Sequence, residues 1–311
     1  MCNIRKSDAC YHGRMNSVPI EGLELAVAPN IKPFKQQLLK WVGNKQRMAH
    51  VIAQLFPQDL SVYHEPFLGS GAVLGTLAPE RAIASDALLP LVEIWQELST
   101  DPASLKRWYS DRRDRVDIEG KHEVYESVKA SYNRQPNGAD LLFLCRSCYG
   151  GIVRFRKADG FMSTPCGAHN PIPSTKFSAR VDEWAFRTRG ASFYHSDFRQ
   201  SFERATAGDL IYCDPPYTDT QSILYGAQEF KLHDLIESID RAKSRGVRVA
   251  LSIDGTKKSG LHRVLHDFPA GLFEAEAAID VGRSMLRRFQ MGGQSLGAEV
   301  VADRLLLTYS L

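Results

Sequence analysis

The stretch Asp214-Pro215-Pro216-Tyr217 combines an acid, two prolines and an aromatic ring directly after the apolar run Leu210–Cys213. A strand that ends there sets the carboxylate and the ring at the carboxyl edge of a parallel sheet, where such folds bind ligands. Proline has no N–H group, so this stiff backbone offers its carbonyl oxygens as acceptors. The stretch therefore predicts a ligand-binding site, because a turn that only closes a strand needs neither an acid nor an aromatic ring.

A second candidate site is the glycine-containing stretch Glu65–Gly71, EPFLGSG, between an expected strand and a helical stretch. Glycines at such a turn adopt positive φ angles and let the backbone approach a ligand closely. Fifteen residues further on, another apolar run ends at Asp86. An acid at that place in a nucleotide-binding fold accepts hydrogen bonds from ribose hydroxyls. The alternative role of Asp86 is to cap the helix expected over 87–98.

Positive charge is concentrated in one part of the chain. Residues 141–190 hold eight Lys and Arg against three acids, although the formal net charge of the whole chain is only +3. A basic island in a nearly neutral protein indicates a local contact with a polyanion. For the charge alone, the alternative explanation is a solvated, charge-rich surface.

The expected secondary structure alternates between strands and helices. Short apolar runs that end in polar or acidic residues predict strands over 61–65, 81–86, 191–197, 209–214, 246–254 and 302–310. Apolar residues recur at helical spacing over 38–56, 87–98 and 232–244. This alternation predicts an α/β fold with a mostly parallel sheet that is covered on both faces.

The order of these segments divides the chain into three parts. Residues 1–33 contain several prolines and glycines and are expected to form a loosely ordered arm. Residues 34–100 and 191–311 form the expected catalytic domain. Residues 101–190 are an insertion that begins helical and carries the basic island, and we interpret it as a mostly helical target-recognition subdomain.

Composition is that of an ordinary globular protein. The chain has 311 residues, 43% apolar and 24% charged, enough for one large α/β domain with an insertion. No apolar run reaches the roughly 18 residues of a membrane helix, and the first residues lack the apolar core of a signal peptide. We therefore expect a cytoplasmic protein with no membrane contact.

The six cysteines are too few for a disulfide scaffold, which fits a reducing compartment. Cys145, Cys148, Cys166 and His169 have the spacing of a structural zinc site. However, Cys145 falls where a helix is expected to end, and the stretch between the two pairs must keep Arg154 of the basic island available for its polyanion. Ordinary packing cysteines are the favoured interpretation, and no metal is expected.

The chain resembles the Dam-type (alpha-group, D12 class) DNA adenine methyltransferases from about residue 36 to 311. The resemblance depends on stretches in that family's order and approximate spacing, namely Lys40–Lys45 (KWVGNK), Glu65–Gly71, Asp86 and Asp214–Tyr217. Arg146–Arg156 also looks like the family's target-recognition segment. The resemblance implies a seven-stranded, Rossmann-like methyltransferase sheet, S-adenosylmethionine as cofactor and adenine in double-stranded DNA as substrate.

The resemblance also implies roles for single residues. Trp41 and Lys45 would close over the cofactor, with Lys45 near its carboxylate. The full expected cofactor set is Trp41, Lys45, Pro66, Phe67, Gly69, Gly71, Asp86, Asp197, Phe198 and Asp214, with Asp86 on the ribose and Asp197 and Phe198 on the adenine ring. The expected catalytic residues are Asp214, Pro215, Pro216 and Tyr217. The expected DNA contacts are Arg146, Tyr149, Arg154, Arg156 and Lys157.

The implied mechanism addresses the weak nucleophilicity of an aromatic amine, whose lone pair is delocalised into the ring. Hydrogen bonds from the amine to the Asp214 carboxylate and the Pro215 carbonyl would localise the lone pair and aim it at the sulfonium methyl. The base is inaccessible inside a duplex, so it must be flipped out, with Tyr217 stacking on its face.

Two departures from the family concern the choice of target. The family usually has Asn at the positions of Gly150 and Arg156, and its basic stretch near the C-terminus is missing, with Arg287 and Arg288 nearby. GATC, which the members resembled most often read, is therefore only one hypothesis, in which Arg154 contacts a guanine. The resemblance allows a restriction endonuclease of the same specificity as a partner, and a monomer or weak dimer.

Three alternative functions remain. Methylation of adenine in RNA fits the same site, since phosphate contacts do not distinguish the two nucleic acids. Methylation of a protein glutamine amide also suits an Asp-Pro-Pro-Tyr site but has no need of the basic island. A DNA-binding module without catalysis would keep the basic insertion but has no reason to combine Asp214, Tyr217 and Lys45.

Overall fold

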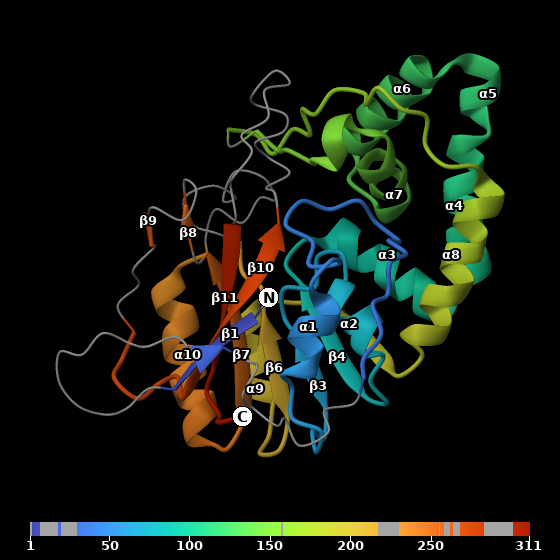
Figure 1. Cartoon of the computed structure of the whole chain (residues 1–311). Coiled ribbons are helices and arrows are strands. Elements are labelled where there is room, and N and C mark those ends of the chain that lie inside the picture. The colour runs from blue at the N-terminus through green and yellow to red at the C-terminus, as the bar shows by residue number, and fades with distance from the viewer. Residues whose placement is uncertain are drawn as a thin grey trace.

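The computed structural model describes residues 2–6, 18–19, 30–156, 158–216, 230–254, 256–257, 262–263, 268–282 and 301–311 (Figure 1). Two residues of the expected site, Lys157 and Tyr217, lie outside the described residues, as do Arg287 and Arg288. No helix within the described part of the chain is both long and apolar enough to cross a membrane.

The centre of the fold is a sheet whose five parallel strands are, in spatial order, β5 (Ala191–His195), β4 (Ala82–Asp86), β3 (Tyr63–Glu65), β6 (Leu210–Cys213) and β7 (Arg248–Asp254). Two strands follow at the β7 edge. β11 (Val301–Leu307) pairs antiparallel with β7, and β10 (Ala275–Gly282) pairs antiparallel with β11. The expected α/β fold with a seven-stranded sheet is therefore confirmed.

Two further strands extend this sheet to nine. β1 (Cys2–Lys6) pairs antiparallel with β10, and β2 (Val18–Pro19) pairs with β1. These pairings differ from the loose arm expected over 1–33. The physical reason is that β10 would otherwise be an edge strand, whose unpaired N–H and C=O groups are a template for another strand. A separate two-stranded sheet joins β8 (Thr256–Lys257) and β9 (His262–Arg263).

The central strands are apolar on both faces because each face is covered. Leu210 and Tyr212 of β6 belong to one hydrophobic core, and Ile211 and Cys213 belong to a second core. The first core includes α1 (Ala49–Gln54), α2 (Ala72–Leu77) and α3 (Leu89–Thr100). The second includes α9 (Phe198–Arg204) and α10 (Leu232–Ser244). Such two-sided burial is typical of parallel strands.

The stretch 101–190 folds into five helices and a hairpin. The helices are α4 (Pro102–Arg113), α5 (Arg115–Glu119), α6 (Lys121–Arg134), α7 (Gly138–Ser147) and α8 (Ser174–Arg187). Local sequence sets the starts of α4 and α7, because Asp101 accepts a hydrogen bond from the Ser104 N–H and Asn137 from the Asp140 N–H. The hairpin follows a single 3₁₀ turn (Tyr149–Gly151) and includes an antiparallel bridge between Phe155 and Met162.

The segment before α1 is irregular, although its apolar spacing predicted a helix over 38–56. Only Ala49–Gln54 is α-helical. Gly43 has a φ of +75°, which ends any helix before it. The Asn44 side chain also donates to the Trp41 carbonyl and accepts from the Gln46 N–H, so it satisfies the backbone groups that a helix would use. This irregular segment leads into the candidate site.

Candidate functional site

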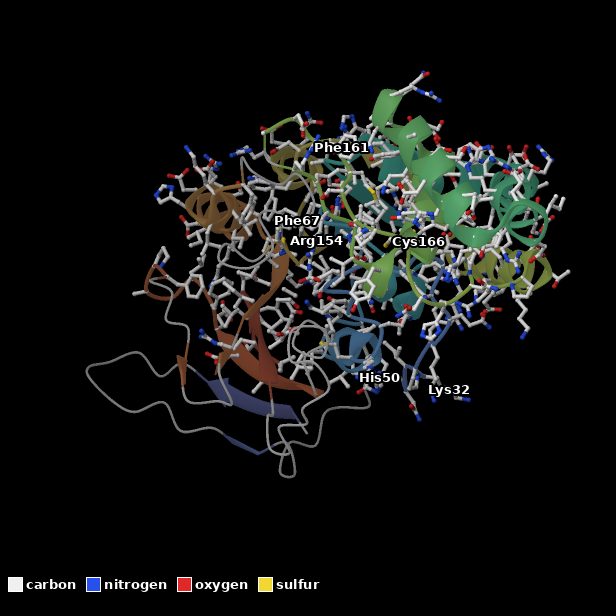
Figure 2. The ribbon with its side chains drawn as sticks, turned by 90° about the horizontal axis from the view of Figure 1, so that it is seen from above. Lys32, His50, Phe67, Arg154, Phe161 and Cys166 are labelled. Carbon is white, nitrogen blue, oxygen red and sulfur yellow. The ribbon has the colours of Figure 1, made fainter. Side chains whose placement is uncertain are left out.

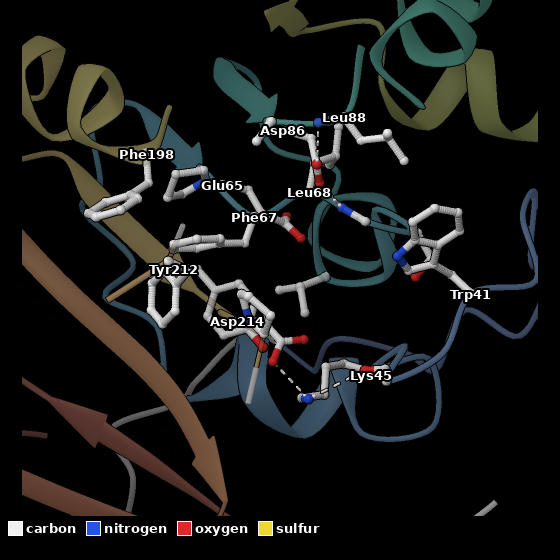
Figure 3. Close-up of a pocket in the computed structure, with 18 of the residues that line it drawn as sticks. Trp41, Lys45, Glu65, Phe67, Leu68, Asp86, Leu88, Phe198, Tyr212 and Asp214 are labelled. Carbon is white, nitrogen blue, oxygen red and sulfur yellow. Dashed lines mark hydrogen bonds and ion pairs between the residues drawn. The ribbon is translucent and has the colours of Figure 1, made fainter. Parts of the chain in front are cut away.

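A cavity of about 980 Å³ lies at the carboxyl edge of the parallel strands (Figure 3). The segment before α1 lines one part of it, and the residues that follow β3, β4, β5 and β6 line the rest. The motifs singled out in the sequence thus meet in one place. Of the expected cofactor and catalytic residues, the cavity is lined by Trp41, Lys45, Pro66, Phe67, Gly69, Asp86, Asp197, Phe198, Asp214 and Pro216.

The turn after β3 folds back onto the end of β4. Gly69 has a φ of +47°, and its N–H donates a hydrogen bond of 3.0 Å to Oδ2 of Asp86. A Cβ atom on Gly69 would lie 3.2 Å from the Trp41 ring, so a side chain there would crowd the indole. Glycine at this position therefore allows both the turn and the close approach of Trp41.

Gly71 has a packing and turn role that the motif alone did not indicate. Its neighbours Ser70 and Ala72 line the cavity, and a Cβ atom on Gly71 would lie 2.8 Å from the Trp95 ring. Its φ of +62° and its place at the start of α2 also favour glycine. Its place in the cofactor set stays a prediction.

Asp86 joins the two strand ends and faces the cavity. In addition to the Gly69 N–H, its carboxylate accepts a hydrogen bond of 3.0 Å from the Leu88 N–H at the start of α3. Burial raises the pKa of Asp86, although these backbone hydrogen bonds oppose the rise. The N-cap residue of α3 is Leu88, so Asp86 does not cap the helix as the alternative expected: it binds the N–H of the N-cap residue and also lines the cavity.

Three aromatic rings gather at one part of the cavity. Phe67 stacks on Phe198 with ring centroids 5.4 Å apart, and Phe230 meets Phe67 edge to face at 5.7 Å. Next to them, Asp197 caps α9 and forms an ion pair of 2.9 Å with Arg199. Apolar faces beside polar groups suit a flat heteroaromatic ligand. Phe230 had no signal in the sequence, since it stands in no motif.

Lys45 forms ion pairs with two carboxylates. Its Nζ lies 2.8 Å from Oδ1 of Asp214 (Figure 3). It also lies 3.4 Å from Oδ2 of Asp303. Burial lowers the pKa of Lys45, but the two carboxylates outweigh it, so the pKa lies well above its ordinary value. Lys45 is therefore a buried cation beside Asp214. Sequence analysis missed Asp303 because nothing near it marks a site.

Glu65 is a further buried acid that lines the cavity, with only 3% of its surface exposed. The Tyr63 hydroxyl donates a hydrogen bond of 2.7 Å to its Oε2 atom. Burial raises the pKa of Glu65 to about 8, and the charge of Asp214 contributes to the rise. Glu65 therefore holds a proton at neutral pH. Its place in the EPFLGSG stretch was the available signal, but no role was assigned to it.

The expected DNA contacts have different environments. Arg154 is exposed (Figure 2), and 45% of the Tyr149 surface is exposed. Arg156 is also exposed, but it pairs with Asp159 and stacks over the Phe161 ring at 4.2 Å. Arg154 and Tyr149 are thus solvent-exposed in the structure, and Arg156 forms a local ion pair with Asp159.

Arg146 was expected to contact DNA, but the structure buries its side chain. Only 4% of its surface is exposed, and its Nη1 donates to the carbonyl oxygens of Gln37 and Leu38 at 3.1 and 2.7 Å. Arg146 lies in the last turn of α7, before the hairpin. Its guanidinium group is bound by carbonyl oxygens inside the protein. Its role is to hold the segment that leads to Trp41 and Lys45.

The cysteines behave as packing residues rather than as a ligand set. Cys145 and Cys148 are buried, and their thiols donate to carbonyl oxygens within α7. Burial raises the pKa of both thiols, which keeps them protonated. Within the described residues, one group of three potential metal ligands has its ligand atoms within 4.8 Å of one another. This group is His233, Asp234 and Glu237.

Replacing Glu65 by Gln should remove a pH dependence of stability. The unfolded carboxyl has an ordinary pKa of 4.5, and the folded one about 8, so the folded state holds an extra proton between these values. The free energy of unfolding of the wild type should therefore fall as pH rises through this window, by at most about 1.4 kcal/mol per pH unit. Gln cannot ionise, so the free energy of unfolding of the variant should lack this contribution to the fall.

Urea denaturation of both proteins at about pH 5, 6.5 and 8 measures the effect. The stability of Glu65→Gln relative to wild type should increase steadily from the lowest to the highest pH. A difference that stays constant across the three conditions would contradict a buried, protonated Glu65.

Comparison with known proteins agrees with this arrangement. The model of the D12 class N6 adenine-specific DNA methyltransferase family matches residues 41–268. The DNA adenine methylase of Vibrio cholerae is 27% identical over 236 residues, covering 70% of this chain and 81% of that protein. That of Haemophilus influenzae is 26% identical over 245 residues, covering 71% and 84%. The type II methyltransferase M1.LlaDCHI of Lactococcus lactis is 26% identical over 244 residues, covering 72% and 81%. Because the family model spans well over half of the chain, the chain belongs to the D12 class N6 adenine-specific DNA methyltransferases.

Proposed function

We propose that this chain transfers a methyl group from S-adenosylmethionine to the N6 amine of adenine in duplex DNA. The observation that carries the proposal is the Asp214 carboxylate, which ends β6 beside a large cavity and is held by Lys45. Membership of the D12 family supports adenine in DNA as the substrate. The exposed Arg154 and Tyr149 within the basic insertion support a nucleic acid partner.

The cavity fits S-adenosylmethionine in size and in chemistry. Its volume of about 980 Å³ is at the large end of ordinary ligand pockets. The Asp86 carboxylate can accept hydrogen bonds from ribose hydroxyls, and Phe67 and Phe198 offer apolar faces to an adenine ring. Trp41, packed beside Gly69, would cover the bound molecule. When bound, the cofactor supplies an electrophilic methyl group on a sulfonium.

The residues of the Asp-Pro-Pro-Tyr stretch would activate the amine of the target base. The Asp214 carboxylate and the Pro215 carbonyl would accept its two hydrogens, which localises the lone pair on nitrogen and directs it to the methyl carbon. The nitrogen–carbon bond forms as the carbon–sulfur bond breaks, and the nitrogen then releases a proton. The rate enhancement would come from orientation and electrostatics.

The target adenine has to leave the duplex to reach Asp214. Enzymes that act on a base in duplex DNA flip it out and bind its face by stacking. Tyr217 is the candidate for this stacking from its place in the motif, although it lies outside the described residues. Arg154 is the candidate for reading the target, since it is exposed on the hairpin after α7.

The first experiment incubates the purified protein with S-adenosylmethionine and duplex DNA and measures N6-methyladenine by mass spectrometry. Wild type should form the modified base, and Asp214→Asn should lower the rate about a hundredfold or more, as loss of a group that stabilises the transition state does. RNA of the same sequence serves as a parallel substrate. Methylation of RNA alone, or of neither nucleic acid, would contradict the proposal.

Replacing Asp86 by Ala should weaken binding of S-adenosylhomocysteine about tenfold or more, because a charge-assisted pair of at least about 1.5 kcal/mol is lost. The melting temperature should fall as well, since the Gly69 and Leu88 N–H groups lose their acceptor. Calorimetry and thermal denaturation measure the two effects. Unchanged affinity with a lowered melting temperature would leave Asp86 with only its structural role.

Arg154→Ala should relax discrimination at one base pair of the target. A bidentate contact to guanine contributes about 1–3 kcal/mol at the specific site, whereas a phosphate contact acts on every sequence alike and sets the salt dependence. The measurement compares methylation rates on the true site, its single-base variants and unrelated duplexes. An equal loss on all of them would show that Arg154 only contacts phosphate.

Arg146→Met is the matched control, since it removes an arginine from the same segment of the insertion. It should lower the melting temperature, because the buried carbonyl of Leu38 loses its donor, at a cost of about 1–3 kcal/mol. The salt dependence of DNA binding should stay as in wild type, since Arg146 is not exposed to a phosphate.

A further inference from the structure

Asp303 is a buried acid far from the motifs in sequence that reaches the same ammonium group as Asp214. Its Oδ2 lies 3.4 Å from the Lys45 Nζ, which lies 2.8 Å from Oδ1 of Asp214. The side chains of Lys45, Asp214 and Asp303 are only 5%, 19% and 11% exposed. Ion pairs of this kind are screened weakly by solvent, so each partner strongly constrains the others.

Lys45 joins two strands that are not neighbours in the sheet. Asp214 follows β6, Asp303 lies on β11, and β7 separates these strands. Asp303 pairs in register with Asp254 near the end of β7, so it lies at the same edge of the sheet as Asp214. No backbone ladder connects β6 to β11 directly, so the ammonium group is a direct link between the two carboxylates.

The second carboxylate affects what the first can do. Apart from the two carboxylates, the Lys45 Nζ donates a hydrogen bond of 3.4 Å to the Gly43 carbonyl, which belongs to its own segment. Asp303 adds a contact from a separate strand, which limits the many rotamers that the flexible lysine stem allows. A second ion pair fixes the ammonium in space, and this fixes the plane of the Asp214 carboxylate. The raised pKa of Lys45 agrees with a cation held by both acids after burial has lowered it.

We propose that Asp303 is a positioning residue for methyl transfer. Asp303 anchors the Lys45 ammonium, and Lys45 in turn holds the Asp214 carboxylate in the orientation that binds the adenine amine. This inference rests on the proposed function. Asp303 acts through Lys45 and does not touch the base. Replacing Asp303 should therefore lower the rate of methyl transfer, and it should do so only in a protein that retains Lys45.

A double-mutant cycle tests this dependence. The proteins are wild type, Asp303→Asn, Lys45→Met and the double variant, each assayed on the adenine substrate that wild type methylates. Asp303→Asn should lower kcat about tenfold while the Kd for S-adenosylhomocysteine stays within about twofold of wild type. In the Lys45→Met background the same substitution should change kcat by less than about twofold, because residues that act together are not additive.

Two further variants separate positioning from general loss of an ion pair. Glu276→Gln removes a buried carboxylate that pairs with Arg304 at 2.9 Å on the neighbouring strand, and it should leave kcat within about twofold of wild type. Asp303→Glu keeps the charge and should recover part of the rate lost in Asp303→Asn. Unchanged kcat in Asp303→Asn, or an equal loss in both Lys45 backgrounds, would overturn the proposal.

The cycle also has a readout that does not need activity. If Asp303 and Lys45 are coupled, the drop in melting temperature caused by Asp303→Asn should differ between the wild-type and Lys45→Met backgrounds. Equal drops would overturn the proposal even in a protein that methylates nothing. A wild type without methyl transfer but with coupled melting temperatures would instead refute the proposed function and leave the Lys45 link intact.

Discussion

The buried ion pair between Lys45 and Asp214 constrains the whole catalytic edge of the sheet. Taking an ammonium and a carboxylate out of water is costly, and the pair is stable only if its geometry is held from several sides. Here β6 supplies Asp214, β11 supplies Asp303, and the turn before α1 supplies Lys45. Three segments far apart in the sequence must therefore be placed to within a hydrogen-bond length. The rest of the fold can be understood as the support that makes this placement possible.

Much of that support comes from the insertion. Three carbonyl groups of the irregular segment before Lys45, those of Gln36, Gln37 and Leu38, are bound by side chains of α7 and α8. Arg146 and Arg180 both donate to the Gln37 carbonyl, and Trp184 donates to the Gln36 carbonyl. The insertion, which also carries the hairpin with the exposed Arg154, thus holds the segment that contains Trp41 and Lys45. Arg146 is buried and Arg154 is exposed, a difference that the net charge of the insertion cannot reveal.

The sequence predicted the alternating elements and the motif residues because these depend on local patterns. Apolar runs that end in acids predicted the parallel strands. The motifs also predicted that Lys45, Asp86 and Asp214 share one site, and all three line the cavity. The strand Ala275–Gly282 was missed because its alanines and glutamate have weak strand propensity, and pairing with β11 overrides it. Arg146, Gly71 and Asp303 could not be placed from sequence, since burial and partners depend on tertiary contacts.

The central claim is that the carboxylate at the end of β6 directs methyl transfer to adenine in DNA. The most direct measurement is sequencing of modified bases in DNA from a methylation-free bacterial host that expresses the wild-type chain. The account predicts N6-methyladenine confined to one short sequence and lost when Asp214→Asn is expressed instead. Unmodified adenine in the presence of folded wild-type protein, or modification of another base, would contradict it.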